Sequence, residues 1–223
     1  MNFYDRLQQE TAAAREHLLA APIFERVRQG QLTLGEYAAF LVQAFHHVKH
    51  TTPLLMTTGG KIGQDREWLR DAIAEYIEEE LGHQEWILND IVACGFDRAK
   101  ARASQPDFHT ELMVAYTYDS IQRISPLAFF GTVQVLEGTS INIASDMADA
   151  IQKQLGLPNE AFSYLRSHGA LDQQHIVFFE NLMNRITDPG EQQIIIHNAN
   201  VYYRLYGNMF RDLNATQVEQ LAA

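Results

Sequence analysis

Hydrophobic residues recur every three or four positions along most of the chain, with polar and charged residues between them. This spacing is typical of amphipathic helices that bury one face, and the alternating runs that indicate strands are scarce. The pattern predicts long helices over 2–20, 33–58, 65–93, 106–123, 126–153, 167–186 and 189–213, and short ones over 22–29 and 158–166. About seven long helices joined by short loops predict an all-α bundle.

Local signals mark several of these helix ends. Thr33 and Glu36 have the spacing of a capping box, and Asp188 stands before a proline at a first-turn position. Pro53 is expected to kink the last part of the helix over 33–58, and Gly95 to end the helix over 65–93. We find no repeats, no low-complexity segment and no long linker, so residues 1–223 are expected to form a single domain.

Composition narrows the class of protein. The 223 residues are 46% hydrophobic, enough to bury one good core, and the formal net charge is −11. The acidic balance, without a cluster of Lys and Arg, argues against nucleic acids and anionic membranes as partners. The sequence shows neither an apolar run of roughly 20 residues nor a signal-peptide core, and its single cysteine, Cys94, fits a reducing compartment. A cytoplasmic protein is expected.

Six side chains carry candidate chemistry. His168, Asp172 and His175 are spaced i, i+4 and i+7, which places them within about 60° of one another on a helix. Glu80 and His83 share a face at i and i+3, and Glu137 stands in a strongly apolar helix, where a carboxylate is costly unless it is paired or binds a metal. Three carboxylates and three imidazoles would suit one or two iron or manganese ions.

Each of these residues also has a structural interpretation. Glu80 lies in a run of acids that could be an ordinary solvated face, with Glu79 as the alternative inward acid. Glu137 could pair with Arg123 or accept a hydrogen bond from a tyrosine. Asp172 could orient an imidazole instead of binding metal.

A second group of polar residues lies on the earlier helix 33–58. Ordinary core or surface placement is the favoured interpretation of His46, His47 and His50, ahead of one of them lining a substrate pocket and of a metal role. Tyr76, one turn before Glu80, is expected to face the same cavity and to offer its hydroxyl to a substrate. Cys94 has no neighbouring base in the sequence, which favours a structural role.

Together these motifs resemble the haem-oxygenase-like helical superfamily, which contains the TenA thiaminases, the pyrroloquinoline-quinone synthase and a non-haem di-iron oxidase branch of CADD-like and UndA-like proteins. The resemblance covers nearly the whole chain and includes the helix 34-LGEYAAFLVQAFHHV-48, the acid/His helix, the central Glu helix and the motif His-x3-Asp-x2-His. It implies an all-α haem-oxygenase-like bundle and a homodimer.

Residue by residue, the resemblance implies metal ligands at His83, Glu137, His168, Asp172 and His175. The branch usually places a sixth ligand, a carboxylate, seven residues before the first histidine, where this chain has Tyr76. Glu80 could take that place; otherwise the second metal is weak or absent.

The TenA branch fits less well. Proteins of that branch carry an Asp directly after the glutamine of the helix over 33–58, and here that position is Ala44. They also carry a nucleophilic cysteine on the central helix, whereas residues 132–139 contain no cysteine. Both differences argue against thiamin hydrolysis.

The function implied is a non-haem iron oxidase or oxygenase that uses Fe(II), one or two ions, and O₂ on a small-molecule substrate. The runs 127-LAFF-130 and 176-IVFFE-180 would suit an apolar substrate, while an amino acid or an aromatic compound stays open. Two alternatives remain: a metal-free enzyme that uses acid–base chemistry on a heterocycle, and a ligand-binding or regulatory interaction protein.

Overall fold

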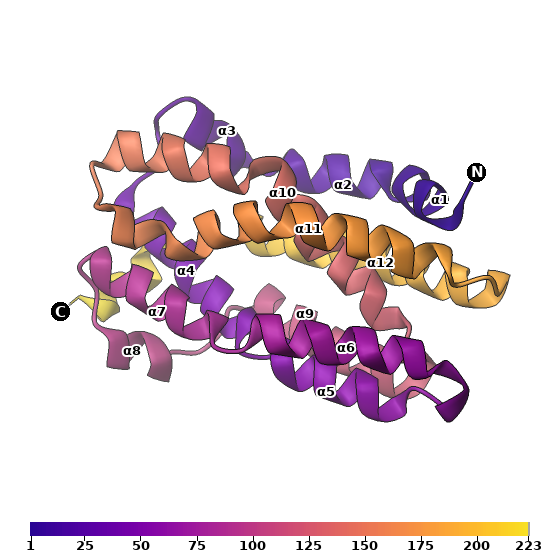
Figure 1. Ribbon diagram of the computed structural model, residues 1–223. Helices are drawn as coiled ribbons and strands as arrows, with labels where there is room; N and C mark the ends of the chain where they lie inside the picture. Colours follow the sequence, from indigo (N-terminus) through magenta and orange to yellow (C-terminus); the bar gives the residue numbers. More distant parts are fainter. Residues whose placement is uncertain (223) are drawn as a thin grey trace.

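In the computed structural model, the backbone is described for residues 1–222 and the side chains for all of these except 141–142, 168–174 and 217. Most of the described chain is helical, and it contains no strand beyond one isolated bridge between Phe96 and Ala222 (Figure 1). Twelve α-helices are present in it: α1 (Phe3–Glu10), α2 (Ala12–Leu19), α3 (Pro22–Arg28), α4 (Leu34–Val48), α5 (Thr51–Lys61), α6 (Glu67–Glu80), α7 (His83–Ala93), α8 (Arg98–Ala103), α9 (Phe108–Asp119), α10 (Ala128–Leu155), α11 (Ser163–Asn184) and α12 (Pro189–Arg211). Short 3-10 turns and one π turn, Ser120–Ile124, connect or end them.

The all-α prediction is confirmed, but the expected number of about seven helices is wrong, because several predicted helices are interrupted. The first is interrupted at Thr11, which follows the last residue of α1 and whose hydroxyl donates to the Leu7 carbonyl at 2.7 Å. The helix expected over 33–58 ends at Val48. Pro53 then lies in the first turn of α5 rather than in a kink, where its missing N–H costs nothing. Periodicity continues across such breaks, so the hydrophobic pattern alone does not reveal them.

Helix α10 is central to the bundle. It packs along both α11 and α12, and it contributes to two clusters of buried side chains. One cluster joins α10 to α5, α6, α9, α11 and α12, and the other joins its C-terminal half to α4 and α7. Close approach to α12 requires Gly131, since a Cβ there would lie 2.6 Å from the Ile195 carbonyl oxygen. This contact sets the depth at which α10 carries Glu137.

The start of α11 is held by a distant side chain. The carboxylate of Asp90, on α7, is fully buried and accepts from the backbone N–H of Ser163 at 3.1 Å and of Tyr164 at 2.9 Å. A carboxylate in this position satisfies free N–H groups and favours the positive end of the helix dipole. Helix α11, which bears His175, is thereby tied to α7, which bears His83.

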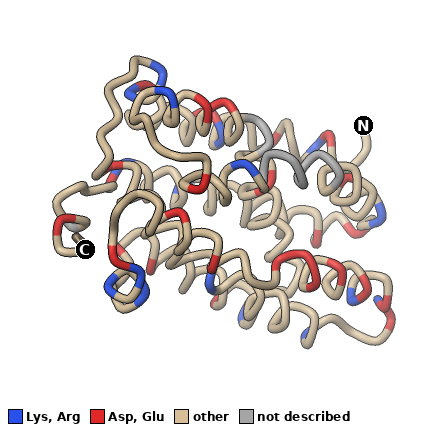
Figure 2. Tube along the Cα trace, turned by 60° about the vertical axis from the view of Figure 1, so that its left-hand side comes forward, with Lys and Arg blue, Asp and Glu red and all other residues tan. Residues whose placement is uncertain are grey.

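Acidic and basic residues are interspersed along the trace (Figure 2), and Arg98 and Arg102, for example, both pair with Glu85. None of the helices in the described part of the chain is both long enough and apolar enough to cross a lipid bilayer.

Candidate functional site

The first part of the site lies where α6 ends and α7 begins. Leu81 is extended (φ −61°, ψ 120°) and Gly82 is left-handed (φ +89°), so the helix predicted over 65–93 is broken at this point. His83 Nδ1 nevertheless lies 3.0 Å from Glu80 Oε2, and the His83 side chain is almost fully buried. Leu81, which the continuous pattern would place on a buried stripe, is 59% exposed because of the break.

The second part joins α10 to α11. Glu137 Oε1 lies 3.8 Å from His175 Nδ1, and both side chains are largely buried. The alternative partner of Glu137, Arg123, instead forms an exposed ion pair with Asp119 at 2.5 Å. The interpretation of Glu137 as the partner of Arg123 is therefore wrong.

Glu79 also contacts His175. Its carboxylate oxygen Oε2 lies 2.9 Å from His175 Nε2, although 39% of the Glu79 side chain is exposed. Helical spacing placed Glu79 toward the outside and retained it only as a substitute for Glu80. In the structure each of the two acids contacts a different histidine: Glu80 contacts His83, and Glu79 contacts His175.

Two of the predicted ligands, His168 and Asp172, lie outside the described side chains. Among the side chains that the structure does describe, no three of His, Cys, Asp or Glu are grouped as a metal site. The described geometry consists of two carboxylate–imidazole contacts, Glu80 with His83 and Glu79 with His175, and Glu137 beside the second.

Tyr76 packs beside His175. It is 2% exposed, and its ring packs edge-on against His175 and Phe178, with centroids 6.2 and 5.5 Å away. Its hydroxyl has no hydrogen-bond partner among the described residues. Burial, followed by the negative charge of Glu137 and Glu79, raises the pKa of Tyr76 well above its ordinary value of 10.0. In the protein alone the phenol therefore stays protonated.

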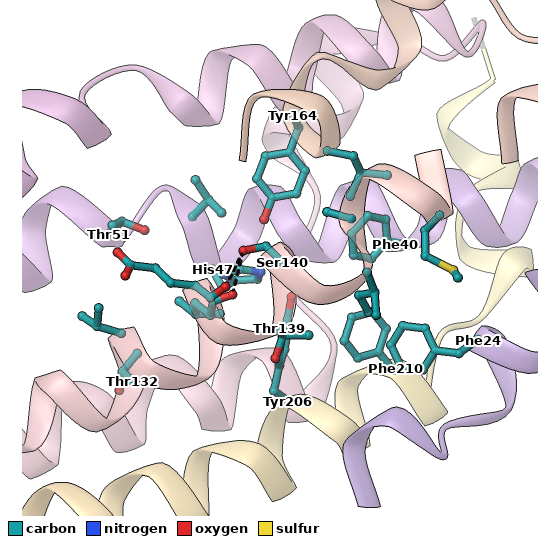
Figure 3. A pocket seen from close by; sticks show the side chains of 18 of the residues that line it. Phe24, Phe40, His47, Thr51, Thr132, Thr139, Ser140, Tyr164, Tyr206 and Phe210 are labelled. Carbon is teal, nitrogen blue, oxygen red and sulfur yellow. Dashed lines mark hydrogen bonds between the residues drawn. The ribbon is translucent and has the colours of Figure 1, made fainter. Parts of the chain in front are cut away.

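A cavity of about 140 Å³ adjoins this group, with Tyr76, Glu80 and Glu137 in its lining. Figure 3 shows Phe24, Phe40 and Phe210 gathered on one side of it, and Thr51 and Thr132 on the other. Most of the remaining lining is aliphatic.

The wall differs from the one that the sequence suggested. From the run 127–130 only Phe129 lines the cavity, and no residue from 176–180 does. The apolar surface comes mainly from α3, α4, α10 and α12, with Leu55 of α5 and Leu165 of α11, and no sequence motif links these helices.

The three histidines of the α4 region have separate environments. His47 lines the cavity and packs edge-on against Tyr206, with ring centroids 5.7 Å apart. His46 lies elsewhere: its Nε2 is 2.9 Å from Ser104 Oγ and its Nδ1 is 3.1 Å from Lys49 Nζ. His50 Nδ1 is 3.2 Å from the hydroxyl of Tyr118. His47 is the histidine placed to touch a bound molecule.

Cys94 has the structural role that its sequence context favoured. It is buried at the end of α7, and burial together with Asp90 raises the pKa of its thiol to about 12. A thiol of that pKa is a poor nucleophile near neutral pH.

Comparison with known proteins places the chain in a family. Residues 38–207 match the model of a family described as iron-containing redox enzymes. The chain belongs to this family. No curated protein matches it.

Solved structures show that this iron-containing redox family member has the haem-oxygenase-like fold. A domain of unknown function from Shewanella denitrificans with a heme oxygenase-like fold superposes with a TM-score of 0.88 at 22% identity, over 99% of this chain and 96% of that one. A TenA homologue from Pseudomonas syringae gives 0.75 at 13% identity, over 96% and 93%. Heme oxygenase-1 from Synechocystis, in complex with heme, gives 0.76 at 11% identity, over 99% and 96%.

The donor set of the site is compatible with iron. Carboxylate oxygens and imidazole nitrogens are ligands that ferrous iron accepts in helical bundles. In the described part of this family member, the residues that could hold such an ion are Glu80, His83, Glu137 and His175. Glu79 contacts His175.

Proposed function

We propose that this protein is a non-haem iron oxidase or oxygenase, which binds one or two Fe(II) ions directly through side chains and acts with O₂ on a small, largely apolar organic substrate. The observation that supports this most is the position of buried carboxylates and imidazoles, Glu80 with His83 and Glu137 with His175, beside an apolar cavity in a chain of an iron-containing redox family.

The number of candidate ligands favours iron held by side chains over haem iron. Haem takes its equatorial ligands from the porphyrin and needs only axial ligands from the protein. Here Glu80 contacts His83 and Glu137 lies near His175, and His168 and Asp172 precede His175 on the same helix, so the candidate ligands outnumber the axial positions of a haem. Several carboxylates close together would repel one another without a cation between them.

In this proposal Glu80, His83, Glu137, His168, Asp172 and His175 hold the metal, with manganese as the alternative ion. Bound ferrous iron would supply the one-electron chemistry with O₂ that side chains lack. The chain's own contribution is to fix the ligands through helix packing, to keep water out with the apolar walls, and to hold the substrate against the side of the cavity bordered by Tyr76, Glu80 and Glu137.

The superfamily resemblance adds a homodimer to the proposal, and the length and composition of the chain add a single domain and a cytoplasmic location. Sedimentation of the purified protein tests the dimer.

The test of the proposed function is the iron content of protein reconstituted with Fe(II) without oxygen. We expect one or two irons per chain, and loss of iron in His83→Ala and His175→Ala. His109→Ala is the matched control, because His109 also contacts a carboxylate, that of Asp212, but lies far from these residues in the sequence and outside the cavity lining.

About two irons per chain would support a di-iron site, and about one would show that Tyr76, in place of a carboxylate, costs the second ion. A wild-type protein that binds no iron would contradict the proposal and would favour the metal-free acid–base enzyme. Iron binding that His83→Ala and His175→Ala leave intact would place the metal elsewhere.

A further inference from the structure

The hydroxyl of Tyr76 is an unusual feature of the site. The side chain is 2% exposed, and its oxygen finds no hydrogen-bond partner among the described residues. A buried hydroxyl without a partner is energetically unfavourable, so such groups call for an explanation, often an ion, a water or a ligand. The same tyrosine lines the cavity with Glu80 and Glu137, so the side chain that carries this oxygen borders the space where a ligand would bind.

The surroundings of Tyr76 point to a cation. Glu137, Glu79 and Glu80 all act on it electrostatically as negative charges. Tyr76 and Glu80 are four residues apart on α6, so they project from the same side of that helix. Its ring packs in a T-shaped arrangement with that of His175, which itself contacts Glu79 and lies near Glu137. A cation placed among these groups would meet oxygen donors from Tyr76, Glu80 and Glu137.

We propose that Tyr76 is itself an iron ligand, bound as phenolate to the ferric ion. The inference rests on the proposed function and extends it. The ligands predicted from the sequence are all carboxylates and imidazoles, whereas Tyr76 would add a phenolate. Phenolate is a hard anionic oxygen donor and favours Fe(III) over Fe(II).

The reaction balances without a further partner. The O–H bond of Tyr76 is broken, an Fe(III)–O bond is formed, and the proton leaves by way of the neighbouring carboxylates, of which Glu79 is partly exposed to solvent. No electron moves in this step. In the test, ferricyanide takes one electron from each bound Fe(II) to make the ferric form.

The experiment is the visible spectrum of the iron-loaded protein after ferricyanide oxidation. Phenolate bound to Fe(III) gives a charge-transfer band in the visible region that carboxylate and imidazole ligands do not give. We expect the wild-type protein to be coloured and Tyr76→Phe to lose the band while it keeps iron. Tyr206→Phe is the matched control, because Tyr206 is also buried and lines the same cavity; its band should remain.

Resonance Raman spectra of the wild-type protein, excited in the band, give a second measurement that does not depend on the stability of a variant. Tyrosinate ring vibrations that shift with ring-deuterated tyrosine would support the proposal. A colourless ferric protein with iron bound, or a band that survives in Tyr76→Phe, would overturn it and leave the proposed function standing. A protein that binds no iron would overturn both.

Discussion

His175 Nε2 lies 2.9 Å from Glu79 Oε2, which joins the last turn of α6 to the middle of α11. Since Nδ1 of the same ring faces Glu137 at 3.8 Å, one imidazole lies between two carboxylates from different helices. A histidine that binds metal through one nitrogen commonly has its other nitrogen held by a carboxylate, which fixes the ring orientation. His175 has the surroundings for that arrangement.

Glu79 is therefore expected to matter for iron binding although it is partly exposed. Glu79→Ala should weaken iron affinity by about 10–100-fold, the usual effect of losing a residue that positions a ligand. Competition with a chelator of known affinity measures this. Glu78→Ala, which removes an exposed neighbouring acid, should leave the affinity unchanged; an equal loss in both variants would mean that only the overall negative charge matters.

Gly82 is expected to be needed for the break between α6 and α7. Its φ is +89°, and a Cβ there would meet nothing within 4 Å, so the cost of Gly82→Ala is conformational and should lower the free energy of unfolding by about 1–2 kcal/mol. Gly60→Ala is the control, because Gly60 also has open space but is helical; it should stabilise by roughly 0.5 kcal/mol. Urea unfolding measures both, and equal effects would contradict the argument.

His46 should make the protein less stable in acid. Lys49 Nζ donates to its Nδ1, and its Nε2–H donates to Ser104 Oγ, which donates on to the Ala101 carbonyl. Burial, with help from the charge of Lys49, lowers the pKa of His46 from 6.5 to about 4. The unfolded chain therefore binds a proton between those values that the folded protein does not, so stability falls as pH drops from 6.5 toward 4.

The loss due to His46 should be at most about 3 kcal/mol over that range. Urea unfolding at several pH values measures it, and His46→Gln should flatten the pH dependence. His197→Gln, at an exposed position, should leave the dependence as it is. A wild-type slope that His46→Gln does not change would assign the acid sensitivity to other groups.

Filling the cavity should exclude apolar ligands. Ala144 is buried and lines the cavity, so Ala144→Leu places three carbon atoms in that space. Burial of one methylene contributes about 0.8 kcal/mol. The binding free energy of an apolar probe such as anilinonaphthalene sulfonate should therefore weaken by about 2 kcal/mol, which raises its Kd about thirtyfold. Fluorescence titration measures this, and Ser145→Leu, on the exposed side of α10, is the control. Unchanged binding in Ala144→Leu would place the probe elsewhere.

Local chemistry in the sequence was enough to predict the helical class and several helix ends. The capping box of Thr33 and Glu36 is present, and the Asp188 side chain accepts from the Glu191 N–H at 2.9 Å. These features depend on residues within one turn of each other, so they can be recognised without knowledge of the rest of the chain. For Glu80 and His83 the spacing predicted one shared helix face, whereas their contact is made across the break at Leu81 and Gly82.

Tertiary structure decided the rest. The break at Gly82 interrupts a hydrophobic periodicity that continues across it. Two other features join segments that are far apart in the sequence: the carboxylate of Asp90 at the start of α11, and the contact of Glu79 with His175. The cavity wall likewise draws on helices that no motif connects. Hydrophobic spacing reports which face of a helix is buried, but only packing determines which other side chains that face meets.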